Sequence, residues 1–390
     1  MNEPSLSSLG ALRRAVKGDH NPRVGATVLV LNAGSSTLKY AAYRADGGST
    51  LTALVRGKVD GIDLDPVVEL LERHLEGASP SAVGHRIVHG GADFLGPTRV
   101  DDRVLKALEE LVPLDPLHQP RSLGALRAAR ARYPSALHVA CFDTSFHRGH
   151  PDVADVVALP RALREAGVRR YGFHGLSYEY VARRLSELDP EVAKGRVVAA
   201  HLGYGASLCA LLDGRSVDST MTFTALDGLV MSTRPGSLDA GVVLWLLDRG
   251  WDRERIARLL WNESGLLALS EKSADLREIL AATTPSARLA VDVFVYTAVK
   301  EAAAMAAALG GLDGLVFTAG IGENQPETRR RIADGLSFLG VALDEEANRR
   351  NDIRIGTSGA RVATFVIPTD EEDVIARYTL ATLHKENPAP

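Results

Sequence analysis

Four charged or titratable side chains stand in short segments that are otherwise apolar or rich in glycine. They are Arg86, Asp143, His174 and Arg234. Each of them alone has a structural explanation, since a buried aspartate can cap a helix and a histidine beside glycine is often a satisfied core residue. Together, however, arginines, a histidine and a carboxylate are the groups that phosphoryl transfer requires. The set therefore predicts a site that binds and transfers phosphoryl groups.

Phosphate binding in this chain has to come from turns outside the common nucleotide-binding motifs. No G-x-x-x-x-G-K-[ST] occurs, which excludes a P-loop enzyme, and no G-x-G-x-x-G stands in a βαβ unit, which disfavours a Rossmann dehydrogenase. Backbone N–H groups in the turns 34–36 (GSS) and 203–205 (GYG) can point together at an anion. A further glycine-rich loop at 318–324 precedes Pro326, which fits the first turn of a helix that offers its N-terminus to phosphate.

Strand-like segments flank the turns 34–36 and 203–205. Residues 28–31 form an apolar run typical of a strand buried on both faces, and a second strand follows after the turn. The same strand–turn–strand unit recurs at 197–202 and 208–212. After it, the pair Asp213-Gly214 predicts a hairpin turn that leads into a third strand, 215–219. Two such units suggest a duplicated domain, although any two hairpins look alike and that explanation stays open.

Helical and further strand segments complete the pattern. Helix-like stretches occupy 100–111, 178–188 and an Ala-rich segment 287–309 that the pair Gly310-Gly311 ends. Strands are predicted at 137–142 and 312–317, the second of them followed by the 318–324 loop and a helix from Pro326 to Leu336. The mixture predicts an α/β fold.

Bulk composition limits the class of protein. A chain of 390 residues favours two domains, and 45% hydrophobic residues with a net charge of −4 give no basic surface for nucleic acid or for a membrane. The two cysteines, Cys141 and Cys209, lie far apart in apolar runs and suit neither a disulfide framework nor a zinc site. Without an apolar run of about 18 residues or a secretory h-region, we expect a cytoplasmic protein.

Six segments, in this order along the chain, resemble the acetate kinase family. They are 32–39 (NAGSSTLK), 85–91 (HRIVHGG), 142–147 (FDTSFH), 170–175 (RYGFHG), 201–207 (HLGYGAS) and 317–324 (FTAGIGEN). The likeness extends from about Val28 to Arg377. It implies two duplicated actin-like (ribonuclease H-like) domains, related to sugar kinases and Hsp70, with the active site in the cleft between them. The family's members are homodimers, so the resemblance implies a homodimer here.

The same likeness implies domain boundaries. The first domain would comprise residues 26–147 plus 370–390, and the second, which binds nucleotide and dimerises, residues 148–369. Residues 1–25 would be a flexible extension.

The resemblance also implies a role for individual residues. Asp143, Arg86, Arg234 and His174 would form the catalytic centre, with the two arginines clamping the carboxylate and the phosphoryl group through their planar forks. Asn32, Glu371 and Asp143 would hold Mg²⁺, an ion that prefers hard oxygen ligands. Because a carboxylic acid is already an anion at pH 7, Asp143 would orient the reactants and abstract no proton.

Substrate and nucleotide contacts follow from the same motifs. Arg86, Val88, Leu117, Phe173 and Ala225 would bind the acid and shape the pocket for its acyl tail. The residues implied for ATP and its phosphates are Lys39, Ser35, Ser36, His201, Gly203, Tyr204, Gly205, Asp275, Leu276, Arg277, Gly320, Ile321, Gly322 and Asn324.

Several positions depart from the family's usual wording. Tyr204 replaces an asparagine near the phosphates, and a phenol there would narrow the channel or change the phosphoryl donor, unless its ring turns aside. Leu176 and Tyr178 replace Thr and His after His174, the segment 232–240 around Arg234 is altered, and the segment between Lys39 and Arg86 is short. Ala225 replaces a proline, which leaves room for propionate or a slightly larger acid.

The sequence thus favours an acetate kinase that transfers phosphoryl from ATP to acetate with Mg²⁺. Two alternatives remain open at this point. One is a propionate- or butyrate-type carboxylate kinase, which rates across chain length would distinguish. The other is a catalytically weak paralogue that binds nucleotide or acyl phosphate as a sensor, although the complete set of catalytic residues argues against it.

Overall fold

The computed structural model describes residues 25–34, 37–46, 48–61, 69 and 79–386, and the structural statements below concern these residues. The predicted phosphate-binding residues Ser35 and Ser36 lie outside them. So does the predicted N-terminal extension, apart from Gly25.

The first sheet contains six strands in the order β3-β2-β1-β4-β6-β5. Their bounds are β1 Ala26–Ala33, β2 Thr37–Ala45, β3 Leu51–Asp60, β4 Ala82–Ile87, β5 Thr98–Arg99 and β6 Leu137–Phe142. β1, β2 and β3 form an antiparallel meander, and β4 and β6 continue the sheet parallel to β1. The carboxyl ends of β1, β4 and β6 therefore meet at one edge.

The second sheet contains five strands in the order β11-β10-β7-β8-β9. Their bounds are β7 Arg196–Leu202, β8 Ala206–Leu212, β9 Arg215–Ser219, β10 Gly314–Thr318 and β11 Ala363–Val366. Again an antiparallel meander, β7-β8-β9, is extended by two strands parallel to its first member.

The two sheets share more than their strand order. In β2 the pairing shifts register between Ala42 and Tyr43, and in β8 it shifts between Ala210 and Leu211. Both shifts fall four residues after the position that begins the hairpin pairing, Leu38 in β2 and Ala206 in β8. A bulge at the same place in two equivalent strands is a feature inherited with the unit. The predicted duplication is confirmed.

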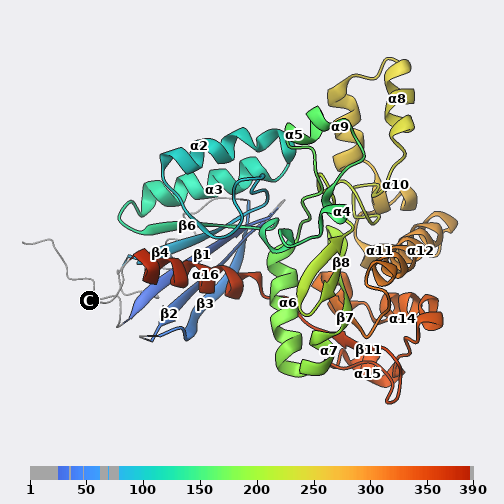
Figure 1. Cartoon of the computed structure of the whole chain (residues 1–390). Coiled ribbons are helices and arrows are strands. Elements are labelled where there is room, and N and C mark those ends of the chain that lie inside the picture. The colour runs from blue at the N-terminus through green and yellow to red at the C-terminus, as the bar shows by residue number, and fades with distance from the viewer. Residues whose placement is uncertain (1–24, 35–36, 47, 62–68, 70–78, 387–390) are drawn as a thin grey trace, which may run out of the picture.

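The central strands of both sheets are buried on two faces, as their apolar runs predict, whereas β3 at the edge is partly exposed. In the first sheet, Leu29 packs in a cluster with Ala125 of α3 (Gln119–Arg132), whereas its neighbour Val28 packs in a cluster with Val374 of α16 (Glu371–Glu386). This alternation follows from the two-residue period of a strand. Figure 1 shows α2 (Asp102–Glu110) and α3 over one face and α16 across the other.

The second sheet is covered in the same way. Its clusters join one face to α12 (Pro285–Ala308) and the other to α6 (Gly175–Leu188). α6 also contacts α16, and Leu176 near its start belongs to the core of the first sheet. α6 thus packs against both halves of the molecule (Figure 1). The division at residues 147/148 and 369/370 stays a prediction.

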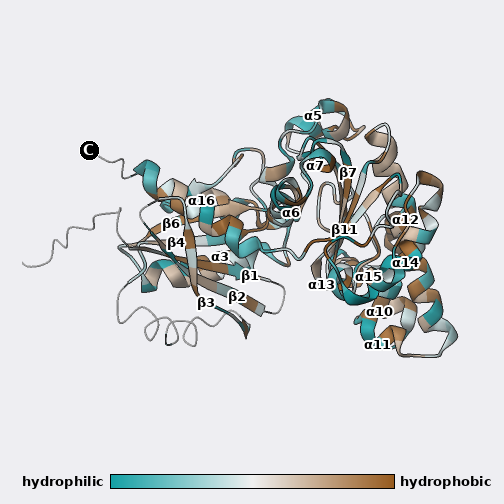
Figure 2. Ribbon diagram, turned by 90° about the horizontal axis from the view of Figure 1, so that it is seen from below, coloured by the Kyte–Doolittle hydropathy of each residue, from teal (hydrophilic) through white to brown (hydrophobic). Residues whose placement is uncertain are grey.

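The remaining helices lie mostly around the second sheet. They are η1 Val112–Leu114, η2 Ser145–His147, α4 Asp152–Asp155, α5 Arg161–Glu165, α7 Pro190–Lys194, α8 Ala240–Asp248, α9 Arg253–Asn262, α10 Gly265–Ser270, α11 Leu276–Leu280, α13 Ala319–Asn324, α14 Pro326–Gly335, η3 Ser337–Leu339 and α15 Glu345–Arg350. Hydrophobic residues follow the strands, whereas α15 is mainly hydrophilic (Figure 2). Among the helices of the described ranges, none has the length and apolar character needed to cross a bilayer.

The predicted loop at 318–324 is wrong, because residues 319–324 form the short helix α13. Ala319 adopts a left-handed conformation with φ of 65°, and its N–H donates to Oε1 of Glu323 at 2.8 Å. The same oxygen accepts the N–H of Thr369 at 3.1 Å. A side chain within the helix thus satisfies the first N–H of α13, a contact that propensity alone did not reveal.

α16 packs tightly on the first sheet at Gly84 of β4. A Cβ at this position would lie 2.2 Å from Oγ1 of Thr379 and 2.6 Å from Cγ2 of Ile375. No side chain fits there unless α16 moves away from the sheet.

We therefore predict that Gly84→Ala lowers the free energy of unfolding by ~1–3 kcal/mol, the usual effect of overpacking. Gly96→Ala is the control, because a Cβ at Gly96 meets nothing within 4 Å. Urea unfolding of both variants measures the effect. Equal stability of the two would contradict the close packing of α16 on β4.

Candidate active site

Two adjoining cavities share Gly203, Tyr204 and Gly320, and the second of them is lined by residues from both halves of the molecule. The first has a volume of about 520 Å³ and is lined by Gly203, Tyr204, Ser232, Ser273, Ala274, Asp275, Leu276, Arg277, Gly320, Ile321, Asn324 and Gln325. The second has a volume of about 410 Å³ and is lined by Asn32, Gly34, Thr37, Lys39, Arg86, His118, His174, His201, Gly203, Tyr204, Gly205, Arg234, Ala319, Gly320, Glu323, Thr369 and Glu371. The second cavity collects residues from the edges of both sheets.

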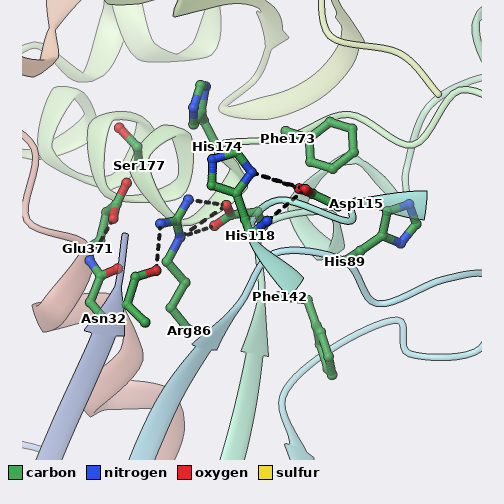
Figure 3. Close-up of polar contacts among 12 residues, drawn as sticks. Asn32, Arg86, His89, Asp115, His118, Phe142, Phe173, His174, Ser177 and Glu371 are labelled. Carbon is green, nitrogen blue, oxygen red and sulfur yellow. Dashed lines mark hydrogen bonds and ion pairs between the residues drawn. The ribbon is translucent and has the colours of Figure 1, made fainter. Parts of the chain in front are cut away.

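One side of the second cavity is formed by the end of β1 and the start of α16. Asn32 donates from Nδ2 to Oε2 of Glu371 at 2.8 Å and to Oε1 of Glu372 at 2.7 Å (Figure 3). Burial alone would raise the pKa of Glu371, but the charges of Arg86 and Lys39 outweigh it and hold that pKa below its ordinary value. Two carboxylates and an amide oxygen therefore converge beside the cavity.

A buried ion pair joins the ends of β4 and β6. Arg86 donates from Nη2 to Oδ2 of Asp143 at 2.6 Å and from Nε to both carboxylate oxygens at 3.1 and 3.2 Å. Burial alone would lower the pKa of Arg86, but the carboxylates of Asp143 and Glu371 raise it above its ordinary value. Asp143 is fully buried behind the guanidinium, which alone of the two lines the cavity.

His174 faces the ion pair from the start of α6. It adopts a left-handed backbone with φ of 57°, and the next amide, Gly175 N–H, donates to the backbone oxygen of Asp143 at 2.9 Å. Its ring stacks on that of His201, with centroids 4.0 Å apart. Burial and neighbouring positive charges lower the pKa of His174 well below its ordinary value, so the ring is neutral at pH 7.

Arg234 completes the cationic side of the cavity. Its Nη1 donates to the carbonyl of Ala225 at 2.6 Å, and its guanidinium lies 5.9 Å from the ring centre of Trp261. Burial lowers the pKa of Arg234 to about 10, which leaves the side chain charged at neutral pH. Arg86, Arg234 and Lys39 thus face the same space as Glu371.

The predicted acyl-tail residues come together next to this space. Val88, Phe173 and Ala225 belong to one buried apolar cluster, and Leu117 packs against it. The hydrogen bond from Arg234 to Ala225 ties the cluster to the cavity. None of these four described residues lines either cavity itself.

The predicted nucleotide residues divide between the two cavities. Those in the first are Gly203, Tyr204, Asp275, Leu276, Arg277, Gly320, Ile321 and Asn324, and those in the second are Lys39, His201, Gly203, Tyr204, Gly205 and Gly320. Gly322 is buried below them and lines neither. Tyr204 is 54% exposed and lines both cavities where they meet, so it does not belong to the core.

Sequence reasoning missed a carboxylate–imidazole pair in the second cavity. Nδ1 of His118 lies 3.0 Å from Oδ1 of the fully buried Asp115 (Figure 3). Burial alone would raise the pKa of Asp115, but bonding to His118 and the charge of Arg234 hold it below its ordinary value. The available signal was the Asp-x-x-His spacing, in which Asp115 also accepts the N–H of His118. Other lining residues missed were Ser232, Ser273, Ala274, Gln325, Thr37 and Thr369, whereas Gly34, Ala319 and Glu323 lie in the segments predicted to bind phosphate.

The arrangement suits a polyanion that extends from one cavity into the other. The first cavity is mostly apolar and large enough for a nucleoside, while the second presents three cationic side chains and a neutral imidazole. Across the described residues, no three His, Cys, Asp or Glu side chains are grouped as a metal site. Any ion bound there would rely on Glu371, the amide of Asn32 and the oxygens of its own ligand.

Comparison with known proteins identifies the family. The acetokinase family model matches residues 68–377, well over half of the chain. The chain belongs to the acetokinase family. Within this family, an acetate kinase of Nitrobacter hamburgensis is 48% identical over 389 residues, covering 92% of this chain and 96% of that protein. An acetate kinase of Rhizobium meliloti is 46% identical over 391 residues, covering 92% and 99%.

Solved acetokinase-type structures share the fold. A propionate kinase from Francisella tularensis superposes with a TM-score of 0.81 at 32% identity, covering 91% of this chain and 99% of that one. The Porphyromonas gingivalis acetate kinase gives 0.79 at 34% identity, covering 92% and 100%. These likenesses and the duplicated sheets confirm the predicted pair of actin-like domains with a cleft between them.

His89 supports the site from behind and carries a perturbed pKa. Its ring is fully buried against the edges of Tyr171 and Phe173, and its Nδ1 accepts the N–H of Gly91 at 2.8 Å. Burial lowers the pKa of His89 to about 4. In the unfolded chain a histidine titrates near 6.5, so between pH 4 and 6.5 the unfolded state binds the extra proton and acid destabilises the fold.

We therefore predict that His89→Asn, which keeps an acceptor for Gly91, reduces the pH dependence of unfolding. Between pH 6.5 and 4.5, the free energy of unfolding should fall more steeply with acid in the wild type than in the variant. The two slopes should differ by about 1.4 kcal/mol per pH unit, which corresponds to one proton. Denaturant titrations at several pH values measure both slopes, and other groups cancel in the comparison. Parallel slopes would refute a neutral His89 in the folded state.

Proposed function

We propose that this protein is an acetate kinase, which reversibly transfers the γ-phosphoryl group of ATP to acetate to give acetyl phosphate and ADP. The observation that carries the proposal is the second cavity, where Arg86, Arg234 and His174 face one space beside a nucleoside-sized cavity. Membership of the acetokinase family supports it, as do the curated relatives that bear the name acetate kinase.

ATP would bind across both cavities. Its adenosine would occupy the first, between Ile321 and the Asp275–Arg277 pair, in which Nη2 of Arg277 lies 2.5 Å from Oδ2 of Asp275. Its phosphates would pass Gly203 and Tyr204 into the second cavity. There the backbone of this turn and Lys39 would neutralise their charge.

The acid would bind between Arg86 and Arg234. It is an anion at neutral pH and needs no base to become a nucleophile, so the protein's task is to bring two anions together. Both guanidinium groups are buried and charged, which strengthens their interaction with carboxylate and phosphoryl oxygens. Neutral His174 would donate a hydrogen bond to the group in transfer.

Mg²⁺ fits the oxygen-rich side of the cavity. Glu371 is ionised there, and Asn32, which uses its Nδ2 for the two glutamates, keeps its Oδ1 for an ion. Asp143 would act through water, because both of its oxygens already accept from Arg86. When bound, the ion supplies charge neutralisation to the phosphates of ATP.

Longer acids remain the second candidate substrate class. Ala225 lies in the apolar cluster next to Arg234, and its side chain is shorter than the proline that the resemblance leads us to expect there. A solved structure with this fold, at a TM-score of 0.81, is that of a propionate kinase, and propionate is therefore the longer acid to test first. A weakly catalytic sensor is the third candidate, supported by Tyr204 at the junction of the cavities.

We predict that hydroxamate trapping detects acyl phosphate with ATP, Mg²⁺ and acetate, and that Arg234→Ala lowers turnover at least about 10²-fold, as expected for a lost transition-state donor. Formate, propionate and butyrate are assayed in parallel to rank chain length. ATP binding without product from any acid would reject the kinase and favour the sensor. Near-normal turnover of the Arg234 variant would reject the role given to Arg234.

We also propose that the protein is a homodimer that associates through α8. This helix lies at the outer end of the second half (Figure 1), and several of its large apolar side chains are exposed. Leu244 is 63% exposed and Trp245 51%, and Leu238, Val242 and Leu247 are exposed beside them. Helices of globular proteins normally bury such a face, so this one fits a second copy of the chain.

For the dimer, we predict that Leu244→Glu produces monomers in light scattering, while the wild type has twice the chain mass. Leu95→Glu is the matched control, because Leu95 is also 63% exposed and lies in the loop before β5. A monomeric wild type, or a Leu244 variant that remains dimeric, would exclude α8 as the interface.

A further inference from the structure

The imidazole of His174 is the first member of a buried chain of hydrogen bonds. Its Nδ1 lies 2.8 Å from Oγ of Ser207, at the start of β8, and that oxygen lies 2.5 Å from the phenol oxygen of Tyr178. Ser207 and Tyr178 are both fully buried. Tyr178 also donates its backbone N–H to the carbonyl of His174 at 3.0 Å. The tyrosine is thus joined to the histidine at both its backbone and its ring.

The proton of each hydroxyl can be assigned by elimination. The phenol oxygen of Tyr178 has one hydrogen-bond partner among the described residues, Oγ of Ser207 at 2.5 Å. The phenol proton then has one acceptor within reach, Oγ of Ser207. Because a hydroxyl carries a single proton, Ser207 has its own proton left for Nδ1 of His174.

The opposite direction leaves a proton without an acceptor. If Ser207 donated to Tyr178, the phenol proton would be buried with no partner among the described residues. Such a group carries its full desolvation penalty. Since neutral histidine has one acceptor and one donor nitrogen, an Nδ1 that accepts requires the proton on Nε2.

Nε2 is the nitrogen that faces the cavity. A Cβ placed on Gly205 would lie 3.2 Å from Nε2 of His174 and 2.8 Å from Nη2 of Arg234, so both nitrogens border the same space. A proton on Nε2 therefore points toward the position proposed for the phosphoryl group. A proton on Nδ1 would present a lone pair there, which repels an anionic oxygen.

We propose that Tyr178 and Ser207 are positioning residues that hold the proton of His174 on Nε2, where it donates to an oxygen of the phosphoryl group in transfer. The inference rests on the proposed function for the identity of that group, but the position of the proton can be tested without turnover. It gives a physical role to Tyr178, one of the positions at which this chain departs from its family. A phenol suits the role, since burial raises its pKa and it keeps its proton across the working pH range.

The test compares Tyr178→Phe with Tyr378→Phe. The first removes the phenol oxygen and retains the ring. The second removes a half-buried phenol that donates to Glu179 at 2.6 Å and lines neither cavity. Long-range ¹H–¹⁵N correlation spectra of ¹⁵N-histidine-labelled protein report which nitrogen of His174 is protonated, with His174→Gln used to assign the signal.

In the wild type and in Tyr378→Phe, we expect the His174 proton on Nε2. In Tyr178→Phe we expect a mixture of tautomers and kcat reduced about tenfold or more, a common effect of losing a supporting hydrogen bond, with KM values for ATP and the acid within about twofold. Ser207→Thr, which retains the hydroxyl, should keep the Nε2 tautomer, whereas Ser207→Ala should lose it.

Three results would overturn the proposal. They are a wild-type proton on Nδ1, an unchanged tautomer in Tyr178→Phe, and a fall in kcat without any change of tautomer. The first needs only the wild type and the His174→Gln variant used for assignment, and so decides the matter even where the Tyr178 and Ser207 variants do not fold. Failure of the proposed function looks different, because the wild type would then keep the Nε2 proton and yet make no acyl phosphate.

Discussion

The site depends on one buried carboxylate. Asp143 stands at the end of β6 with no exposed surface, and a charge placed there without a partner is strongly destabilising. Arg86 supplies that partner from the neighbouring parallel strand, through three contacts that satisfy both carboxylate oxygens. The backbone oxygen of the same residue accepts the N–H of Gly175 and so sets the start of α6 and the left-handed His174. One residue thus fixes the arginine through its side chain and the histidine through its backbone.

The charged side chains around the second cavity come from the ends of strands and from the start of α16. Asn32 lies near the end of β1 and Arg86 near the end of β4, at the shared edge of the first sheet. Glu371, at the start of α16, lines the same cavity. The cations of the cavity hold Glu371 ionised in spite of its burial, while burial and the same cations keep His174 neutral. One electrostatic environment thus keeps a carboxylate ionised and an imidazole neutral on the lining of the same cavity.

The sequence predicted those features that repeat or are local, and missed those that depend on partners remote in the chain. Runs such as 28–31 revealed strands buried on two faces, and the two hairpins indicated the duplication that the matching bulges in β2 and β8 confirm. By contrast, α13 forms because Glu323 caps it from within, a contact that glycine propensity hides. The Asp115–His118 pair escaped because two polar residues between prolines have no periodicity. Tyr178 was visible only as an unusual residue, since its partner Ser207 lies on another element.

The position of α16 has a consequence for synthesis on the ribosome. The first sheet is assembled from residues 26–142, yet one of its faces is covered by a helix that begins at Glu371. A nascent chain therefore carries this sheet with an uncovered apolar face while the whole second half is translated. Loop closure over more than two hundred residues must follow before the face is shielded. During that interval the growing polypeptide presents an aggregation-prone surface, and a trigger-type chaperone at the exit tunnel has a defined stretch of sequence to protect.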